Sequence, residues 1–403
     1  NKSNRMKKVI ISISFLIMAS GLLAQKNEVQ NAINYIGSAR FDLAKAKESI
    51  DKATDHPSTS NYYKTWYYRG KVYLTIFESR KEEEKKLDEN ALEKSHEAYL
   101  KYLQIDTKKR KIDDTIKELW RVANHYFNRG SDEFNAGVEA AKNNNEAEVI
   151  ANYAKAVTSF ENSTAIYQLP QYELLDTLLV YRTGLAALRG KQYDKAMKYF
   201  NQCIDFNYGG EDVFLGISDI YMAKGDTIKA IETLERGIKV YPDNNLGILA
   251  NLIDFYVQSG KSVEALNYIN LAIEKNPNHN VLFHIKGKLF DDLGEFDKAV
   301  EAYSKAIEIK PDYSDSNYNL AIMYFNKGAD IFNESNSVTD NDKYNEMQDL
   351  GKEYYTKSLP YFETCHKIEP TDAAILDLLK RITYRLGLTD RNREINELIK
   401  NLR

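Results

Sequence analysis

The sequence predicts an all-α fold in which short helices pair into hairpins and the hairpins follow one another along the chain. Three observations predict it. Between residues 280 and 312, apolar residues recur every three or four positions, which is the spacing of two amphipathic helices. Gly294 ends the first of these helices and Pro311 ends the second. Prolines recur at Pro242, Pro277 and Pro311, which are 35 and 34 residues apart.

The hairpin at 280–312 carries small residues where its two helices must approach closely, namely Gly287, Ala299 and Ala306. Because glycine inside a helix costs about 1 kcal/mol relative to alanine, Gly287 indicates contact with a neighbouring helix. The full set of spaced positions is Phe283, Gly287, Phe290, Gly294, Phe296, Ala299, Tyr303, Ala306 and Pro311. This set resembles the tetratricopeptide repeat, a helix-turn-helix unit of about 34 residues.

The resemblance extends over nearly all of residues 25–403. It implies a right-handed superhelical solenoid of about nine helical hairpins, in which each hairpin buries its apolar face against the next. In solenoids of this family the first helix of each hairpin lines a concave face, and that face usually grips peptides or partner domains.

The N-terminal segment has the layout of a secretory signal peptide. Lys7 and Lys8 precede an apolar run at 9–23, which ends in small residues at Ala24, so we expect cleavage before Gln25. The run is shorter than the roughly 20 residues that span a membrane, although an uncleaved anchor is the alternative. We therefore expect an exported, periplasmic or envelope-associated protein of a Gram-negative bacterium, with no integral membrane span in the mature chain.

The regularity of the repeats predicts four divisions of the chain. They are a signal segment with a short N-terminal extension at 1–24, irregular repeats with long helices at 25–170, regular repeats at 171–313, and C-terminal repeats with an insertion and a capping helix at 314–403.

In the N-terminal repeats, Phe41 and Ala44 match the second-helix positions of the first hairpin. The charged run at 78–90 is expected to be a solvated helix extension, with a binding tract as the alternative. Three asparagines at 143–145 are expected to separate the two helices of the third hairpin.

In the regular repeats, Gly190 lies one place before the expected turn position. Further on, the polar stretch at 333–342 is expected to be a loop. A long helix is expected at 344–368, with a kink near Pro360 because proline removes a backbone donor and clashes one turn back.

Composition and motifs indicate no enzyme, cofactor or metal site. The formal charge of −4 and the lack of a basic stripe argue against nucleic-acid binding. The six histidines never occur at the i, i+4 spacing of a helical zinc pair, and no phosphate-binding glycine loop or nucleophile elbow occurs. The two cysteines, Cys203 and Cys365, fall at small-residue positions four repeats apart, so we expect both to be buried and unpaired.

The concave face is the remaining candidate for function. Trp120, Tyr181 and Tyr318 are expected to be aromatic anchors, since tryptophan and tyrosine are enriched at binding hot spots. The alternative is that these residues pack against the helix of the next repeat. The expected partner-binding residues are Tyr67, Lys71, Trp120, Asn124, Phe127, Tyr181, Leu185, Leu215, Asp219, Asp254, His284, Lys288, Tyr318 and Ile322.

Two functions from different classes follow from these expectations. The first is a non-enzymatic scaffold that binds a protein or peptide, as part of an envelope complex. The second is a receptor or carrier for a glycan or other small ligand, because the chain has 29 tyrosines that could stack on sugar rings. Lys71 and Asn124 do not reproduce the paired Lys and Asn set with which chaperone-binding members hold a terminal carboxylate. The sequence predicts neither the partner's identity nor the oligomeric state.

Overall fold

The computed structural model describes residues 27–402 apart from 38–39 and 244. Every regular element in this part of the chain is a helix, and no strand occurs in it. Contacts divide the chain into two compact units, Asn1–Lys224 and Gly225–Arg403, a boundary that the repeat pattern did not predict. The all-α fold class is confirmed, whereas the signal segment at 1–24 lies outside the described residues.

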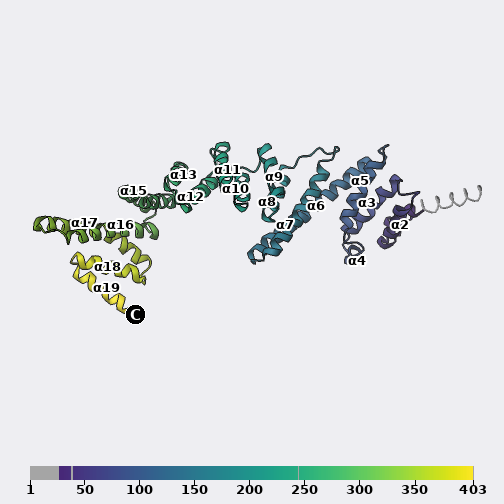
Figure 1. Ribbon diagram of the computed structural model, residues 1–403. Helices are drawn as coiled ribbons and strands as arrows, with labels where there is room; N and C mark the ends of the chain where they lie inside the picture. Colours follow the sequence, from purple (N-terminus) through teal and green to yellow (C-terminus); the bar gives the residue numbers. More distant parts are fainter. Residues whose placement is uncertain (1–26, 38–39, 244, 403) are drawn as a thin grey trace, which may run out of the picture. The chain divides into compact units, whose positions relative to one another are not determined.

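Unit 1 is built of successive helical hairpins (Figure 1). Residues 27–36 are helical and pack near α2, while α3 pairs with α5, α6 with α7, and α8 with α9. The remaining helices of unit 1 are α2 (Leu43–Asp55), α3 (Tyr63–Glu78), α4 (Glu82–Lys85), α5 (Ala91–Ile105), α6 (Ile112–Lys142), α7 (Glu146–Tyr167), α8 (Thr177–Arg189), α9 (Tyr193–Asp205) and α10 (Glu211–Ala223).

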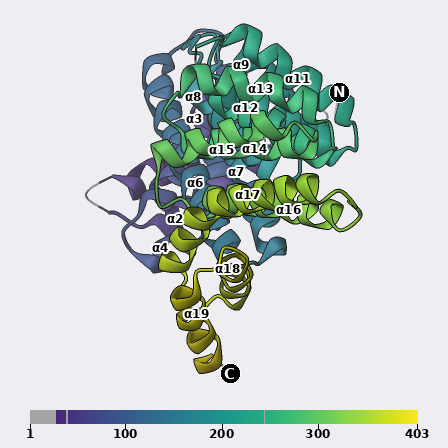
Figure 2. The same cartoon turned by 90° about the vertical axis from the view of Figure 1, so that its left-hand side faces the viewer.

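Unit 2 continues with hairpins of the same kind. The pair α16 and α17 is the longest in this unit, and the two helices lie side by side in both views (Figures 1 and 2). The helices are α11 (Thr227–Val240), α12 (Leu246–Gln258), α13 (Ser262–Lys275), α14 (Asn280–Asp292), α15 (Phe296–Ile309), α16 (Ser314–Ser335), α17 (Asn341–Ile368), α18 (Ala373–Arg385) and α19 (Thr389–Asn401).

In several hairpins, an aromatic ring of the second helix packs against a glycine of the first. A Cβ on Gly130 would lie 2.7 Å from the Phe160 ring, and a Cβ on Gly287 would lie 2.7 Å from the Tyr303 ring. The rings of Phe160 and Tyr303 are almost fully buried. Interiors packed at this density have no room for an extra carbon, so these glycines fix how closely the two helices approach.

In several hairpins, the short turn between the two helices contains a left-handed residue. Gly294 provides it between α14 and α15, with φ of 71°. Between α8 and α9, Gly190 has φ of −81° and Lys191 takes the left-handed conformation, with φ of 56°. The early position of this glycine in the sequence therefore corresponds to a strained lysine in the structure.

The expected register of the first hairpin is wrong. Phe41 lies before α2 and is 47% exposed, and Ala44 is also exposed. Asp42 caps the helix, since its carboxylate accepts a hydrogen bond from a backbone amide of the first turn. The buried positions are consequently those of Leu43 and Ala46.

The charged run at 78–90 is exposed for most of its length, but it is not a helix extension. The helix α3 ends at Glu78, because Ser79 has an extended backbone, and only the short α4 interrupts the loop that follows. The asparagines at 143–145 form the turn between α6 and α7, as expected.

Half of the polar stretch at 333–342 is helical, so the connection is shorter than the expected loop. Only residues 336–340 connect α16 to α17, where the Asp340 carboxylate accepts a hydrogen bond from the Lys343 amide at 2.8 Å. The helix α17 continues through Pro360 to Ile368, and the kink near Pro360 stays a prediction. Cys203 and Cys365 are buried and unpaired, as expected.

None of the helices in the described part of the chain is long and apolar enough to cross a membrane.

Candidate functional site

One face of α6 carries a row of side chains that are not buried in the core of its hairpin. Trp120, Asn124, Phe127, Ser131 and Phe134 recur every three or four residues and so lie along the same side of this helix. The helix α6 has 31 residues, whereas each helix from α8 to α15 has 13 or 14. The row is therefore longer than a helix of regular length could carry.

A cavity of about 480 Å³ lies between this row and α8, with Phe160 of α7 also in its wall. Tyr181 and Leu185, both expected on the concave face, line this cavity. The ring of Phe127 lies 6.2 Å from that of Phe160, and the Arg182 guanidinium lies 5.6 Å from the Phe127 ring. We call this the α6/α8 groove; its lining residues are Ser131, Phe134, Asn135, Phe160, Leu178, Tyr181, Arg182 and Leu185.

Trp120 lies at the N-terminal part of the row on α6 and is 40% exposed. Its ring centroid is 5.0 Å from that of Tyr167 and 5.6 Å from that of Tyr172. The Tyr167 hydroxyl donates a hydrogen bond to the Asn124 side chain at 2.8 Å. Trp120, Tyr167 and Tyr172 therefore form one aromatic cluster, and Asn124 is hydrogen-bonded to it through Tyr167. Trp120 packs against both tyrosines but remains partly exposed to a partner.

The other expected residues of unit 1 do not line the α6/α8 groove. Tyr67 is only 4% exposed, and its ring packs against those of Tyr99 and Tyr102 in the core. Tyr67 is therefore a core residue, which corrects its expected place on the concave face. Lys71 is half-buried on α3, and on α10 Leu215 is half-buried and Asp219 exposed.

In unit 2, the structure brings three expected residues together. Asp254 of α12, and His284 and Lys288 of α14, line a cavity of about 710 Å³ between these two first helices. The floor is apolar, with Ile253 and Leu282 among its residues. Neighbouring first helices of unit 2 thus share one surface, as the repeat pattern predicts.

A second cavity of unit 2, of about 440 Å³, adjoins the first through His284 and Lys288 and includes the expected Tyr318. Its other ionisable residues are acidic: Asp315 of α16, Glu369, and Asp372, the cap of α18. Ile322, also expected here, is instead half-buried against the core of α16 to α19. The same core includes α18, which packs against α17.

His284 links the two cavities of unit 2. Its Nδ1 lies 3.0 Å from the Ser316 hydroxyl, and its ring packs 5.6 Å from Tyr303 and 5.4 Å from Tyr313. Burial among these rings lowers the pKa of His284, so the imidazole is neutral at pH 7. A neutral imidazole offers a partner a hydrogen-bonding group without adding charge.

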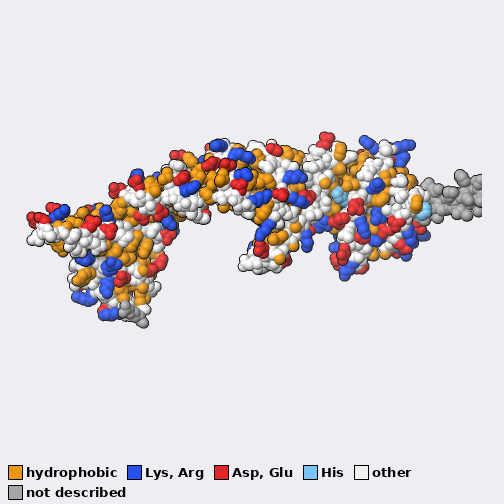
Figure 3. All heavy atoms as spheres, viewed as in Figure 1, with side chains coloured by type: hydrophobic (Ala, Val, Ile, Leu, Met, Phe, Trp, Pro, Cys, Tyr) orange, Lys and Arg blue, Asp and Glu red, His pale blue; other side chains and the backbone are white. Residues whose placement is uncertain are grey.

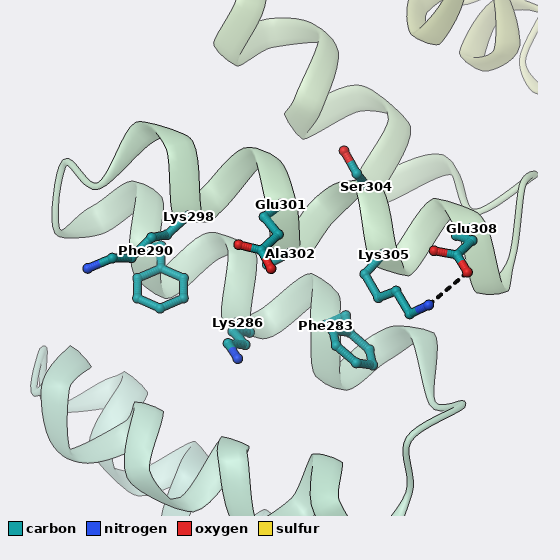
Figure 4. Close-up of a pocket in the computed structure, with 9 residues that line it drawn as sticks. All are labelled: Phe283, Lys286, Phe290, Lys298, Glu301, Ala302, Ser304, Lys305 and Glu308. Carbon is teal, nitrogen blue, oxygen red and sulfur yellow. Dashed lines mark hydrogen bonds and ion pairs between the residues drawn. The ribbon is translucent and has the colours of Figure 1, made fainter.

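A further cavity of about 700 Å³ lies along α14 and α15, and two of its lining residues, Phe283 and Phe290, belong to the repeat motif. Figure 4 shows Phe290 and Lys298 at one end of this cavity and the Lys305–Glu308 ion pair at the other. Lysines of both helices lie near the Phe290 ring, with Lys298 at 5.6 Å and Lys286 at 6.0 Å. The mixed charges give this cavity no clear preference for one class of ligand.

Sequence reasoning missed Phe134 and the arginines of α8. Phe127 and Phe134 are seven residues apart, and so are Arg182 and Arg189, which returns each pair to one face of its helix. The spacing was visible in the sequence, but the cavity between α6 and α8 depends on how the two helices pack. Within the described ranges, no group of three His, Cys, Asp or Glu residues is placed to hold a metal ion.

The grooves and hairpins together define a helical-repeat protein whose candidate sites are surfaces between neighbouring first helices. Models of the tetratricopeptide repeat match residues 179–206 and 212–244, and a TPR repeat model matches residues 287–328. These three segments of the chain are therefore tetratricopeptide repeats.

The chain is similar to curated proteins of diverse kinds. It is 21% identical over 45% of its length to a TPR repeat-containing protein of Methanocaldococcus jannaschii, and 21% identical over 44% of its length to the peroxisomal targeting signal receptor of Kluyveromyces lactis. The matches cover 32% and 37% of these two relatives, so the chain spans about a third of their length.

Among solved structures, the chain is similar to the C-terminal part of a TPR repeat-containing protein from Cytophaga hutchinsonii. The identity is 19%, the match covers 67% of this chain and 95% of the other, and the TM-score is 0.42.

Proposed function

We propose that this protein is a non-enzymatic scaffold that holds a segment of a partner protein in the grooves between its first helices. The observation that carries the proposal is the α6/α8 groove, whose lining combines the apolar side chains of Phe134, Phe160 and Leu185 with the polar groups of Tyr181 and Arg182. Binding sites with an apolar floor and a few polar groups fix both the affinity and the orientation of a ligand. The family resemblance and the name of one relative, a targeting signal receptor, support recognition of a protein segment.

We also propose export to the envelope of a Gram-negative bacterium. The support is the sequence layout of residues 1–24, in which two lysines precede an apolar run that ends in small residues. Cell fractionation of the full chain with a C-terminal tag tests this proposal. A shortened, periplasmic product is expected, whereas a full-length cytoplasmic product would contradict it.

The glycan-binding alternative has less support from the positions of the tyrosines. Rings that stack on sugars must be open to solvent, yet many tyrosines, among them Tyr73, Tyr99 and Tyr126, are almost fully buried. Other tyrosines stay open to solvent: Tyr181 in the α6/α8 groove is partly exposed, and Tyr384 is 75% exposed. Thermal-shift screening against glycans tests this alternative, because a ligand that binds only the folded chain raises the melting temperature.

The scaffold proposal is tested by affinity capture with the full chain, comparing groove variants with a control on the same helix pair. The double change Tyr181→Ala and Leu185→Ala should reduce the yield of any protein that the parent chain captures reproducibly. Lys198→Ala, on the exposed side of α9, is the control and should leave the yield unchanged. Equal capture by the groove variant and the parent would contradict the proposal, provided that both show the same helical circular dichroism.

A further inference from the structure

Arginines that lie over aromatic rings fall into two classes in this protein. In the part of unit 1 that precedes α7, each such arginine also has a carboxylate partner: Arg69 pairs with Asp51, Arg110 with Asp106, and Arg129 with Glu93. Figure 3 shows acidic and basic side chains interspersed over α2–α5. These guanidinium groups are therefore satisfied within the protein.

The arginines of α8 belong to the second class. Arg182 lies 5.6 Å from the Phe127 ring, and Arg189 lies 5.2 Å from the Phe134 ring. Arg189 also donates to the Tyr153 hydroxyl at 3.2 Å. Among the described residues, no carboxylate lies within ion-pair distance of Arg182 or Arg189, which leaves most of their donors to solvent. We call Phe127, Phe134, Arg182 and Arg189 the Arg–Phe surface.

The Arg–Phe surface is prepared to receive carboxylates. A guanidinium group has five donors in a planar fork that matches a carboxylate, and stacking on a ring holds that fork in place before a partner arrives. Arg182 and Arg189 are two helical turns apart, which is about 10 Å along α8. A partner segment with acidic residues at a similar separation could pair with both.

The α6/α8 groove adds an apolar subsite next to these cations. Arg182 itself lines the cavity of about 480 Å³, together with Phe160, Leu178 and Leu185. Leu178 is 41% exposed, so a partner that covers it removes apolar area from water. A ligand that fits must therefore combine an apolar side chain with nearby negative charge.

The same arrangement recurs in unit 2, which argues that it is more than an accident of packing. Arg381 of α18 lies 4.9 Å from the Phe325 ring, and Arg385 lies 5.0 Å from the Phe332 ring. Phe325 and Phe332 are seven residues apart on the long helix α16, as Phe127 and Phe134 are on α6. These two arginines also have no carboxylate partner in the part of unit 2 that the structure describes.

We propose that the Arg–Phe surface of unit 1 binds an acidic segment of a partner protein, with an apolar side chain of that segment seated in the α6/α8 groove. The inference rests on the proposed scaffold function and names the chemical class of the partner. Charge complementarity supports an acidic partner, because the guanidinium groups of Arg182 and Arg189 lie over phenylalanine rings and have no acidic partner within the described residues.

The alternative is a purely structural role, in which each arginine only covers a phenylalanine ring. Methionine distinguishes the two roles, because its long apolar side chain can still cover the ring but has no charge. Under the structural role, Arg182→Met and Arg189→Met would leave ligand binding unchanged. Under the proposed role, the same changes weaken the binding of acidic ligands.

The test uses the full chain carrying Arg381→Met and Arg385→Met, so that only the unit 1 surface remains. Fluorescence anisotropy measures the binding of three labelled peptides of equal length, composed of Leu with Glu, Leu with Gln, or Leu with Lys. The Leu–Glu peptide should bind most tightly, and adding Arg182→Met and Arg189→Met should weaken it by about tenfold for each arginine lost. The control is Arg129→Met, which removes an arginine that Glu93 already satisfies and should leave peptide binding unchanged.

The outcomes separate this inference from the scaffold proposal. Tighter binding of the Leu–Lys or Leu–Gln peptide would overturn the acidic class while supporting peptide binding. Unchanged affinity for the Leu–Glu peptide in the Arg182→Met, Arg189→Met variant would overturn the role of the arginines. Failure of all three peptides to bind would overturn the inference, and the scaffold proposal would fail with it only if Tyr181→Ala, Leu185→Ala also left affinity capture unchanged.

Discussion

Gly287 of α14 lies against the ring of Tyr303 of α15, so closely that a Cβ on the glycine would be 2.7 Å from a ring carbon. Gly130 and Phe160 have the same relationship in unit 1, also at 2.7 Å. Each contact joins the two helices of one hairpin, and each hairpin presents its first helix to a groove. These glycines therefore set how closely the two helices of each of these hairpins approach.

A large side chain at Gly287 should destabilise unit 2. Gly287→Leu would overpack a site that is already filled by Tyr303, and overpacking of this kind costs about 1–3 kcal/mol. Urea unfolding followed by circular dichroism measures the free energy of unfolding. Glu301→Ala, an exposed change on α15, is the control and should alter that free energy by no more than about 0.5 kcal/mol.

Relief of backbone strain at Lys191 should stabilise unit 1. This lysine has φ of 56° in the turn between α8 and α9, where glycine is favoured, so Lys191→Gly is expected to raise the free energy of unfolding by up to about 1 kcal/mol. The exposed ion pair with Glu146 is lost, but such pairs contribute little. The same change at Lys195, inside α9, should instead destabilise the helix; a loss at both positions would contradict the prediction.

The two thiols should be inert in the folded protein. Burial raises the pKa of both Cys203 and Cys365 to about 11, and both side chains are closed to solvent. A thiol reagent at pH 8 should label neither cysteine until urea unfolds the chain, because the thiolate is the reactive form. The raised pKa of each thiol contributes stability that is complete below the ordinary cysteine pKa and is lost as pH rises towards 11. Rapid labelling at low urea would show that a cysteine is open.

Acid should destabilise unit 1 through His96. Burial against the Tyr126 ring lowers the pKa of His96 to about 4, and its Nε2 has no hydrogen-bond partner in the described structure. The unfolded chain takes up this proton near pH 6.5, so the stability is complete above that pH and is lost as pH falls through 4, by up to about 3 kcal/mol.

The variant His96→Phe isolates this effect. Its free energy of unfolding should depend less on pH between 6.5 and 4 than that of the parent chain. The exposed His279 is the control position, since His279→Phe should keep the parent's slope. Parallel slopes for His96→Phe and the parent would contradict a buried, neutral His96.

The repeat architecture could be predicted because glycine, aromatic residues and proline recur at fixed positions, and each type of residue has a distinct structural role at its position. Gly287, Tyr303 and Gly294 are found where the pattern placed them: at a close approach, in the core and in a left-handed turn. The start of α2, and with it the exposure of Phe41, could not be predicted from the apolar pattern, because the cap at Asp42 sets where this helix begins.

The candidate site was predicted only in part. Tyr181, Leu185 and His284 could be placed near a groove, because the repeat fixes which side of a first helix faces inward. Tyr67 was misplaced, since a register error of one residue moves a side chain from the surface to the core. The pairing of Arg182 with Phe127 depends on the distance between two helices, which no single helix encodes.

Photo-crosslinking tests the central claim most directly. A photoreactive residue at position 185 lies in the α6/α8 groove, whereas one at position 198 lies on the exposed side of α9. In cells that express the full chain, the groove position should form a covalent adduct with a distinct partner protein, and position 198 should not. Adducts of the same partner at both positions, or at position 198 alone, would contradict binding in the groove of the first helices.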